Sequence, residues 1–167
     1  LTTGTVTSAE IAAARLPAGA FHQYVPVDVA PWVDRFLDHW RPDLAVFVES
    51  EIWPATIDAL ARRDIPQVLV NARISERSAR RWTRLDGLAA ALFGRLSLVL
   101  AQSEADAGRL RRLGAPAVVV TGNLKFDGRP LPADADELAR LTAAIDGRPT
   151  WVAASTHAGE EAIVATA

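Results

Sequence analysis

Short apolar segments recur along this chain at intervals of roughly 20 to 25 residues, and stretches with helical spacing separate them. Leu44–Val48, Gln67–Val70 and Leu96–Ala101 have the length of buried strands, and each is followed by polar residues and then by a helical pattern. This alternation is typical of βαβ units, in which crossover helices join parallel strands. The sequence therefore predicts an α/β protein, a Rossmann-like three-layer sandwich with a parallel sheet.

Composition narrows the classes of function. Of the 167 residues, 50% are hydrophobic and 23% are charged, which favours a soluble globular domain. The net charge of -2 gives no basis for binding nucleic acid, and the absence of cysteine excludes disulfides and thiolate chemistry. No apolar run approaches the roughly 18 residues that span a bilayer. Because the chain lacks methionine and opens at Leu1, we expect it to be an excerpt of a longer protein.

Several local signals predict where elements begin and end. Thr7 and Glu10 have the spacing of a capping box at the start of a helix. Asp28 is placed to cap the next helix, whose apolar residues fall on one face. Asp127–Ala135 contains glycine and prolines and predicts a surface loop or linker, and Thr150–Ala154 predicts a further strand.

The polar residues of chemical interest follow the predicted strands. Glu49 and Glu51 come directly after Leu44–Val48, and ligands of open α/β sheets bind beyond the carboxyl ends of the strands. The alternative is that both carboxylates are solvated or cap the next helix, where the helix dipole favours negative charge. The other candidates at strand ends are Asn71, Arg73, Gln102, Ser103, Glu104, Asn123, Lys125, Ser155, Thr156 and His157.

Two of these candidates carry a specific expectation. Lys125 is the only lysine of the chain, and lysine supplies a compact charge for phosphate or carboxylate; the alternative is a solvated loop lysine. His157 lies in a glycine-bearing turn before a predicted helix, where free backbone N–H groups attract anions, against the alternative of a histidine without a ligand role. The sequence has no Walker loop, no G-x-G-x-x-G and no spacing that suggests a metal site.

A basic stretch follows the strand at Gln67–Val70. Arg73, Arg77, Arg80 and Arg84 fall on nearly one face at helical spacing. Such a face attracts a phosphorylated substrate or an anionic membrane surface, and the alternative is an ordinary solvated face.

Five segments, taken in order, resemble the bacterial 3-deoxy-D-manno-octulosonic acid (Kdo) transferases of lipopolysaccharide assembly. The resemblance extends from about Thr2 to the last residue. The segments are Glu49–Pro54, Asn71–Ser78, Gln102–Asp106, Thr121–Asp127 and Ala154–Glu161.

This resemblance implies a GT-B glycosyltransferase with two facing Rossmann-like domains. It would move Kdo from CMP-Kdo to a lipid A precursor, inverting the sugar carbon without a cofactor or a metal. The full-length protein would act at the membrane surface, on the cytoplasmic face of the bacterial inner membrane. A non-catalytic α/β binding domain and a different GT-B or nucleotide-sugar enzyme remain as alternatives.

The resemblance also implies an assignment of domains and sites. Residues 1–127 would form the acceptor-side domain, 128–148 the interdomain connection and 149–167 the start of the C-terminal donor-side domain. The family's catalytic carboxylate, in a Gly-Glu pair, is expected upstream of Leu1, so we expect this excerpt to be inactive alone. Glu49, Glu51, Asn71 and Arg73 would line the acceptor side of the cleft, and Asn123, Lys125, Ser155, Thr156 and His157 the donor and phosphate side.

Overall fold

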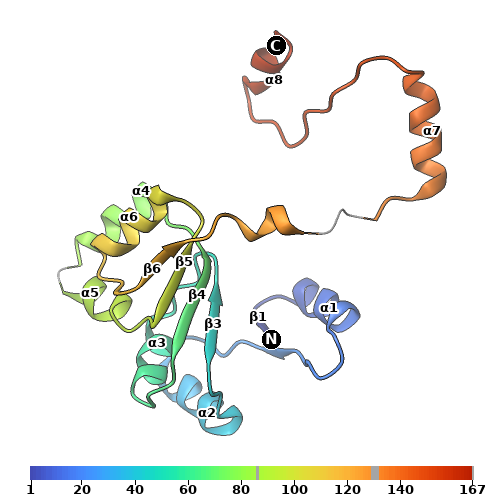
Figure 1. Ribbon diagram of the computed structural model, residues 1–167. Helices are drawn as coiled ribbons and strands as arrows, with labels where there is room; N and C mark the ends of the chain where they lie inside the picture. Colours follow the sequence, from blue (N-terminus) through green and yellow to red (C-terminus); the bar gives the residue numbers. More distant parts are fainter. Residues whose placement is uncertain (86, 129–131, 167) are drawn as a thin grey trace. The chain divides into compact units, whose positions relative to one another are not determined.

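The computed structural model describes residues 1–85, 87–128 and 132–166, and it divides into two compact units (Figure 1). The first unit is Leu1–Gly128 and contains every strand of the described residues. The second unit is Arg129–Ala167, and its described residues contain two helices. Each unit is described by itself below.

A parallel sheet of four strands forms the centre of the first unit. The strands lie side by side in chain order, so that each new strand adds to the same edge. The register places Val46 opposite Val68, and Leu69 opposite Val99. The α/β class and the parallel sheet predicted from the sequence are confirmed. The strands are β3 (Ala45–Val48), β4 (Gln67–Ala72), β5 (Leu98–Ala101) and β6 (Val118–Val120).

Helices connect successive strands and pack on one face of this sheet (Figure 1). Right-handed crossovers that all step in the same direction place their helices on the same side, which explains the arrangement. The helices are α2 (Ala30–Trp40) before β3, α3 (Pro54–Ala61) after β3, α4 (Glu76–Thr83) and α5 (Leu88–Phe93) after β4, and α6 (Glu104–Arg112) after β5.

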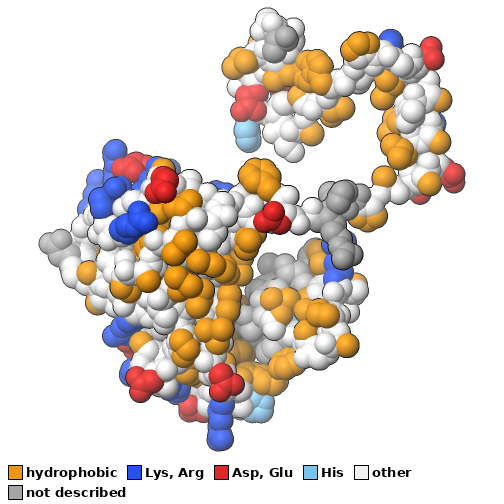
Figure 2. All heavy atoms as spheres, in the orientation of Figure 1, with side chains coloured by type: hydrophobic (Ala, Val, Ile, Leu, Met, Phe, Trp, Pro, Cys, Tyr) orange, Lys and Arg blue, Asp and Glu red, His pale blue; other side chains and the backbone are white. Residues whose placement is uncertain are grey.

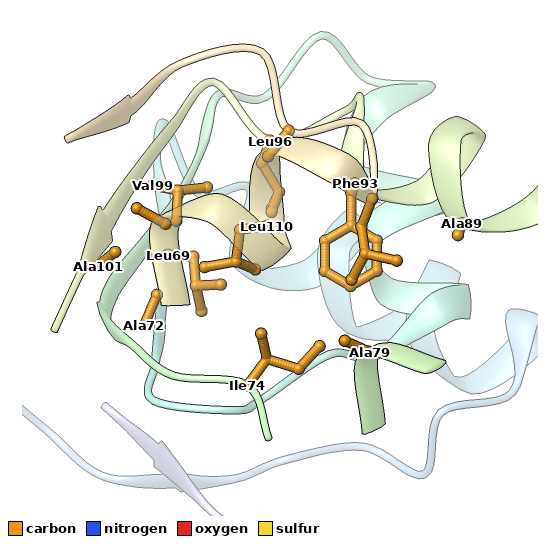
Figure 3. Packing of buried hydrophobic residues seen from close by; sticks show 13 residues of the cluster. Leu69, Ala72, Ile74, Ala79, Ala89, Phe93, Leu96, Val99, Ala101 and Leu110 are labelled. Atoms are coloured by element: carbon orange, nitrogen blue, oxygen red, sulfur yellow. The ribbon is translucent and has the colours of Figure 1, made fainter. Parts of the chain in front are cut away.

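Two clusters of buried side chains hold the helices on the sheet. In the larger cluster Leu69 and Val99 of the sheet meet Phe93 of α5 and Leu110 of α6, and Figure 3 shows these side chains turned into one interior. Each large apolar side chain buried in this way contributes about 1.5–3 kcal/mol. The smaller cluster joins α2 and α3. Its buried members are Val33, Leu37, Ala59 and Leu60.

The apolar stripe predicted for α2 is only partly buried. Val33 and Leu37 are buried, whereas Trp32 is 61% exposed and Trp40 is 39% exposed. Trp40 instead packs against Phe21, with 4.9 Å between the ring centroids. The aromatic side chains therefore lie at the margin of the core rather than inside it.

The first strands form a separate, two-stranded parallel sheet. β1 (Thr2–Thr3) pairs with β2 (Gln23–Tyr24), and α1 (Val6–Arg15) connects them. The predicted Thr7 cap is wrong, because the helix begins earlier and the Ser8 amide donates to Thr5 Oγ1 at 3.2 Å. Thr5 has extended backbone angles, as an N-cap residue requires, whereas Thr7 lies inside the helix.

Asp28 does not cap α2 as predicted. Its carboxylate accepts hydrogen bonds from the amides of Ala55 and Thr56, at 3.1 and 2.8 Å, and from the Thr56 hydroxyl at 2.7 Å. These groups form the first turn of α3, whose own N-cap residue, Trp53, makes no side-chain cap bond. Asp28 therefore caps a helix that follows it by more than 25 residues. α2 begins at Ala30, after the N-cap residue Val29, with a proline in its first turn and no side-chain cap bond.

The second unit has no strand among its described residues. α7 (Ala135–Ile145) is capped by Asp134, and α8 (Glu160–Val164) follows a loop. The predicted strand at Thr150–Ala154 is therefore wrong for this structure. A strand needs a neighbour to satisfy its backbone groups, and none of the described strands pairs with this segment. Trp151 and Val152 are accordingly 62% and 82% exposed.

The predicted loop Asp127–Ala135 includes residues 129–131, which lie outside the described residues. Its first residue, Asp127, is the last residue of the short 3₁₀ helix η1 (Leu124–Asp127).

No helix within the described parts of the chain is both long enough and apolar enough to cross a membrane.

Candidate functional site

Several of the candidate residues singled out from the sequence lie at the carboxyl edge of the four-stranded sheet. Glu49 directly follows β3, Asn71 belongs to the end of β4, Gln102 follows β5, and Asn123 and Lys125 follow β6. Because the four strands are parallel neighbours, their carboxyl ends share one edge. The fold thus brings together residues that are more than 70 positions apart.

An ion pair joins the residues that follow the first and last strands of this sheet. Lys125 Nζ lies 2.7 Å from Glu49 Oε1, and the side chains are 68% and 33% exposed. Glu49 has a φ of 63°, in the left-handed region that non-glycine residues seldom adopt. Its backbone amide still donates to the Val70 carbonyl at 2.9 Å, so the strand ladder reaches this residue before the chain turns. The left-handed turn lets the Glu49 carboxylate face Lys125 across the edge.

Asn71 is the buried anchor of the site. The residue is 3% exposed, and its Oδ1 accepts the Leu124 amide at 3.1 Å. Its carbonyl accepts the side-chain amide of Gln102 at 2.9 Å. Asn71 has a φ of 51° and lies where the register of β4 against β5 shifts between Leu69 and Ala72. Such bulges re-aim side chains at the ends of strands, and this one directs Asn71 toward the turn that carries Lys125.

Asn123 fixes the same turn from the other side. Its Oδ1 accepts the Lys125 amide at 3.1 Å and so caps η1. The amides of Leu124 and Lys125 are therefore each held by an asparagine side chain. This arrangement positions the Lys125 backbone while its ammonium group stays exposed.

The charges around Glu49 keep it ionised. The hydrogen bond from Lys125 is the largest cause that lowers the pKa of Glu49, followed by the charge of Lys125 and then, more weakly, by that of Arg73. Desolvation opposes this shift but does not overcome it. Glu49 is thus a carboxylate at neutral pH, able to accept a hydrogen bond from a hydroxyl group, and Lys125 and Arg73 offer positive charge to an anion.

Arg73 and Glu51 are held at the edge in different ways. The Ser50 hydroxyl donates to the Arg73 carbonyl at 2.8 Å, which ties the turn after β3 to the turn after β4. Glu51 accepts the indole N–H of Trp53 at 2.6 Å, so its carboxylate is engaged by the neighbouring helix start. Among the sequence-predicted acidic residues, the structure therefore joins Glu49 to the shared site and holds Glu51 locally.

Ser155, Thr156 and His157 lie in the second unit, in the loop before α8. The Thr156 hydroxyl donates to Glu161 at 2.7 Å, and the His157 amide donates to Glu160 at 2.9 Å. Ser155 has a φ of 56°. The carboxylates of α8 thus accept hydrogen bonds from the loop that was predicted from the sequence to bind an anion. Thr156 also lowers the pKa of Glu161 by its hydrogen bond.

Sequence reasoning did not single out Ser50 or the role of Gln102. Gln102 follows a strand, but its contact with the Asn71 carbonyl depends on the bulge in β4. The sequence shows only that a polar residue follows each strand, and this pattern does not indicate which of these residues form hydrogen bonds with one another. In the described parts of the chain no group of three or more His, Asp or Glu residues is placed to hold a metal ion.

The fold and this edge define an α/β domain of the open parallel-sheet class, whose ligands bind beyond the carboxyl ends of the strands. The family model described as 3-deoxy-D-manno-octulosonic-acid transferase (kdotransferase) matches residues 1–128. The chain therefore belongs to the 3-deoxy-D-manno-octulosonic acid transferase family.

Relatives from several organisms support this assignment. The 3-deoxy-D-manno-octulosonic acid transferase of Rickettsia felis is 37% identical over 98% of this chain and 35% of its own length. That of Haemophilus influenzae is 36% identical over 98% of this chain and 39% of its own length. A probable mitochondrial 3-deoxy-D-manno-octulosonic acid transferase of Arabidopsis thaliana is 33% identical, over 98% of this chain and 38% of its own length. The chain spans little more than a third of these relatives.

Proposed function

We propose that this chain is the acceptor-side part of a glycosyltransferase that moves Kdo from CMP-Kdo to a lipid A precursor. The observation that carries the proposal is the Glu49–Lys125 pair, held with Asn71 at the carboxyl edge of the sheet, in a chain of the Kdo transferase family. A carboxylate and a cation side by side suit a reaction in which a sugar hydroxyl attacks and an anionic leaving group departs.

The proposed roles follow from the charges of the two residues. An acceptor hydroxyl loses its proton as it attacks, so it needs a carboxylate nearby. Glu49 accepts the hydrogen bond of this hydroxyl and orients it, while the catalytic base itself comes from residues outside 1–167. Lys125 stabilises the anionic donor by charge, in an inverting transfer that needs no bound metal, while Arg73 lines the acceptor side of the cleft.

The remaining assignments extend this proposal along the chain. Residues 1–127 form the acceptor-side domain of a GT-B enzyme, 128–148 the connection and 149–167 the start of the donor-side domain. Ser155, Thr156 and His157 then contribute to the donor side. This division agrees with a first compact unit that ends at Gly128 and with a family match over residues 1–128.

The arginine face of α4 is the proposed contact with the membrane surface. Arg77 and Arg80 of the predicted face lie on α4 and Arg84 is its C-cap residue, whereas Arg73 precedes the helix. All four are exposed, and Figure 2 shows basic side chains gathered over α4 and α6. Arg80 pairs with Glu76, so part of this charge is neutralised within the helix. A cluster of this kind is attracted to anionic lipid, which fits an enzyme working on a lipid acceptor at the cytoplasmic face of the inner membrane.

The test replaces Glu49 in the full-length enzyme. With CMP-Kdo and a lipid A precursor, transfer is followed by the mass of the lipid product. Glu49→Gln should lower kcat by about 100-fold, since a misplaced acceptor loses that much. Glu10→Gln, which makes the same change on the exposed surface of α1, is the matched control and should keep wild-type turnover.

Two results would contradict the proposal. Wild-type turnover of Glu49→Gln with unchanged acceptor affinity would remove the assigned role of Glu49. Binding of both compounds by the wild-type full-length protein without any transfer would instead favour a non-catalytic binding domain.

A further inference from the structure

The peptide group between Arg73 and Ile74 is held at both of its polar ends. Its carbonyl accepts the Ser50 hydroxyl at 2.8 Å, and its N–H donates to Asp106 Oδ1 at 2.9 Å. Ser50 lies in the turn after β3 and Asp106 lies in α6, after β5, so the two partners come from the two neighbours of β4. Because a peptide group is planar, bonds at both ends fix the orientation of its plane.

Asp106 is the more firmly held of the two partners. Its side chain is 15% exposed, and its second carboxylate oxygen bonds to the Ser103 hydroxyl. Arg109 Nη1 lies 3.4 Å from Asp106 Oδ1 and donates to the Ile74 carbonyl at 3.3 Å. The hydrogen bond of Ser50, in contrast, is exposed. A carboxylate is also a stronger acceptor than a neutral group, so Asp106 contributes most to holding this peptide group.

Arg73 is the residue whose side chain these bonds orient. On its other side, the Ala72 carbonyl accepts the Gln102 amide at 2.9 Å, so the backbone is held before Arg73 as well as after it. The Arg73 side chain is exposed, and it lowers the pKa of Glu49 by its charge, without a hydrogen bond between the two. A fixed backbone thus carries a guanidinium whose N–H donors are not used by that carboxylate.

We propose that Asp106 is a positioning residue for the acceptor, which acts through the Ile74 amide and directs the Arg73 guanidinium onto an anionic oxygen group of the acceptor. A guanidinium binds phosphate or carboxylate through two parallel N–H···O bonds, so its affinity depends on its direction. This role rests on the proposed function, because it takes the acceptor side of the cleft as the place where Arg73 binds.

The alternative is that Asp106 serves the fold alone. Ile74 is 7% exposed and belongs to the larger cluster, so the same hydrogen bond also helps to keep its side chain in the core. Asp106 lies in the first turn of α6, where a negative charge is favourable. Both effects would lower stability when Asp106 is lost, but neither would depend on the side chain of Arg73.

Steady-state kinetics of the full-length enzyme, with CMP-Kdo and a lipid A precursor, test this role. Asp106→Ala should raise KM for the acceptor about tenfold and change kcat less than about threefold, because Arg73 binds a group away from the reacting atoms. KM for CMP-Kdo should stay within about twofold of wild type. Asp106→Asn keeps an oxygen that accepts the Ile74 amide and should restore most of the acceptor affinity.

A double-mutant cycle shows whether Asp106 acts through Arg73. Arg73→Met alone should raise KM for the acceptor about tenfold or more. In that variant, the further change Asp106→Ala should raise it less than about twofold. If Asp106→Ala does not fold, the same cycle is run with Ser50→Ala, because Ser50 holds the other end of the same peptide group from an exposed position.

Asp134→Ala is the matched control. It also removes a carboxylate that accepts a backbone amide, that of Glu137 at 2.9 Å, but at the start of α7 in the second unit. Both kinetic constants should stay at their wild-type values in this variant.

Two outcomes would overturn the inference. An equal rise in KM on Asp106→Ala with and without the Arg73 side chain would show that Asp106 serves the fold alone. A rise in KM for CMP-Kdo in place of the acceptor would show that the guanidinium faces the donor. Both outcomes require that transfer occurs, whereas the proposed function fails through an absence of transfer or through a fully active Glu49→Gln variant.

Discussion

Replacement of Asn71 should separate two reasons why an asparagine occupies the end of β4. The side chain accepts the Leu124 amide at 3.1 Å from a position that is 3% exposed. The backbone also adopts a φ of 51°, which asparagine tolerates better than most residues. Asn71→Ala removes both advantages, whereas Asn71→Gly removes the hydrogen bond but keeps an easy left-handed conformation.

The two contributions have different sizes. Leaving the partly buried Leu124 amide without its acceptor costs about 1–3 kcal/mol. Placing alanine in the left-handed region adds about 1 kcal/mol, so Asn71→Ala should destabilise the chain by roughly 2–4 kcal/mol. Glycine avoids that strain, but its greater conformational freedom in the unfolded state destabilises the fold by about 0.4–1 kcal/mol relative to alanine. Asn71→Gly should therefore be as stable as Asn71→Ala or up to about 0.6 kcal/mol more stable.

Urea unfolding of the 167-residue chain, followed by tryptophan fluorescence, measures both values from the shift in midpoint at constant slope. Asn123→Ala is the matched control, because it removes one hydrogen bond to the neighbouring Lys125 amide on an exposed turn. It should cost less than about 1 kcal/mol. A free energy for Asn71→Ala within about 0.5 kcal/mol of wild type, or a glycine variant clearly less stable than the alanine one, would refute the reasoning.

Three further substitutions test other contacts. Asp28→Ala removes three hydrogen bonds to the first turn of α3 and should cost about 1–2 kcal/mol in the same urea assay; an unchanged midpoint would show that α3 does not depend on this cap. Phe93→Ala, at a side chain 1% exposed in the larger cluster, should cost about 3–5 kcal/mol, and a loss below 1.5 kcal/mol would contradict the packing described. Lys125 lowers the pKa of Glu49, so the ion pair stabilises the folded state at neutral pH. This stabilisation begins to be lost when the pH falls below the usual pKa of glutamate, and it is gone once the pH has fallen through the lowered pKa of Glu49. Lys125→Met should therefore reduce stability slightly at pH 7 and not at about pH 2, as measured by urea midpoints across this range, and an equal loss at both values would argue against the ion pair.

Much of the fold could be predicted because its signals are local. Ser103 and Asp106 have the spacing of a helix start, and Ser103 does accept the Asp106 amide at 3.1 Å. Asp28 carries the same kind of signal, but its partners are the amides of Ala55 and Thr56, and no local pattern could reveal a contact over 27 or 28 residues. The segment Thr150–Ala154 has the composition of a strand, yet composition cannot supply the neighbour that a strand requires.

The candidate site was predictable only in outline. The rule that parallel strands share a carboxyl edge places Glu49 and Lys125 at the same edge, and the structure adds that they form an ion pair. The left-handed conformation of Glu49 and the bulge near Asn71 decide which side chains meet. No glycine marks the turn at Glu49, and the asparagine at position 71 permits a left-handed residue without specifying its partners. Glu51 is as acidic as Glu49 and only two residues away, but the indole of Trp53 holds it.

We propose that Glu49 and Lys125, which form an ion pair, depend on each other in Kdo transfer, so that loss of either residue also impairs the role of the other. A double-mutant cycle in the full-length enzyme, with Glu49→Gln, Lys125→Met and the double variant, tests it through kcat/KM for the lipid acceptor. If the pair acts together, the double variant should lose little more than the more impaired single variant. Losses that multiply, so that each residue contributes the same factor whether or not the other is present, would contradict the account.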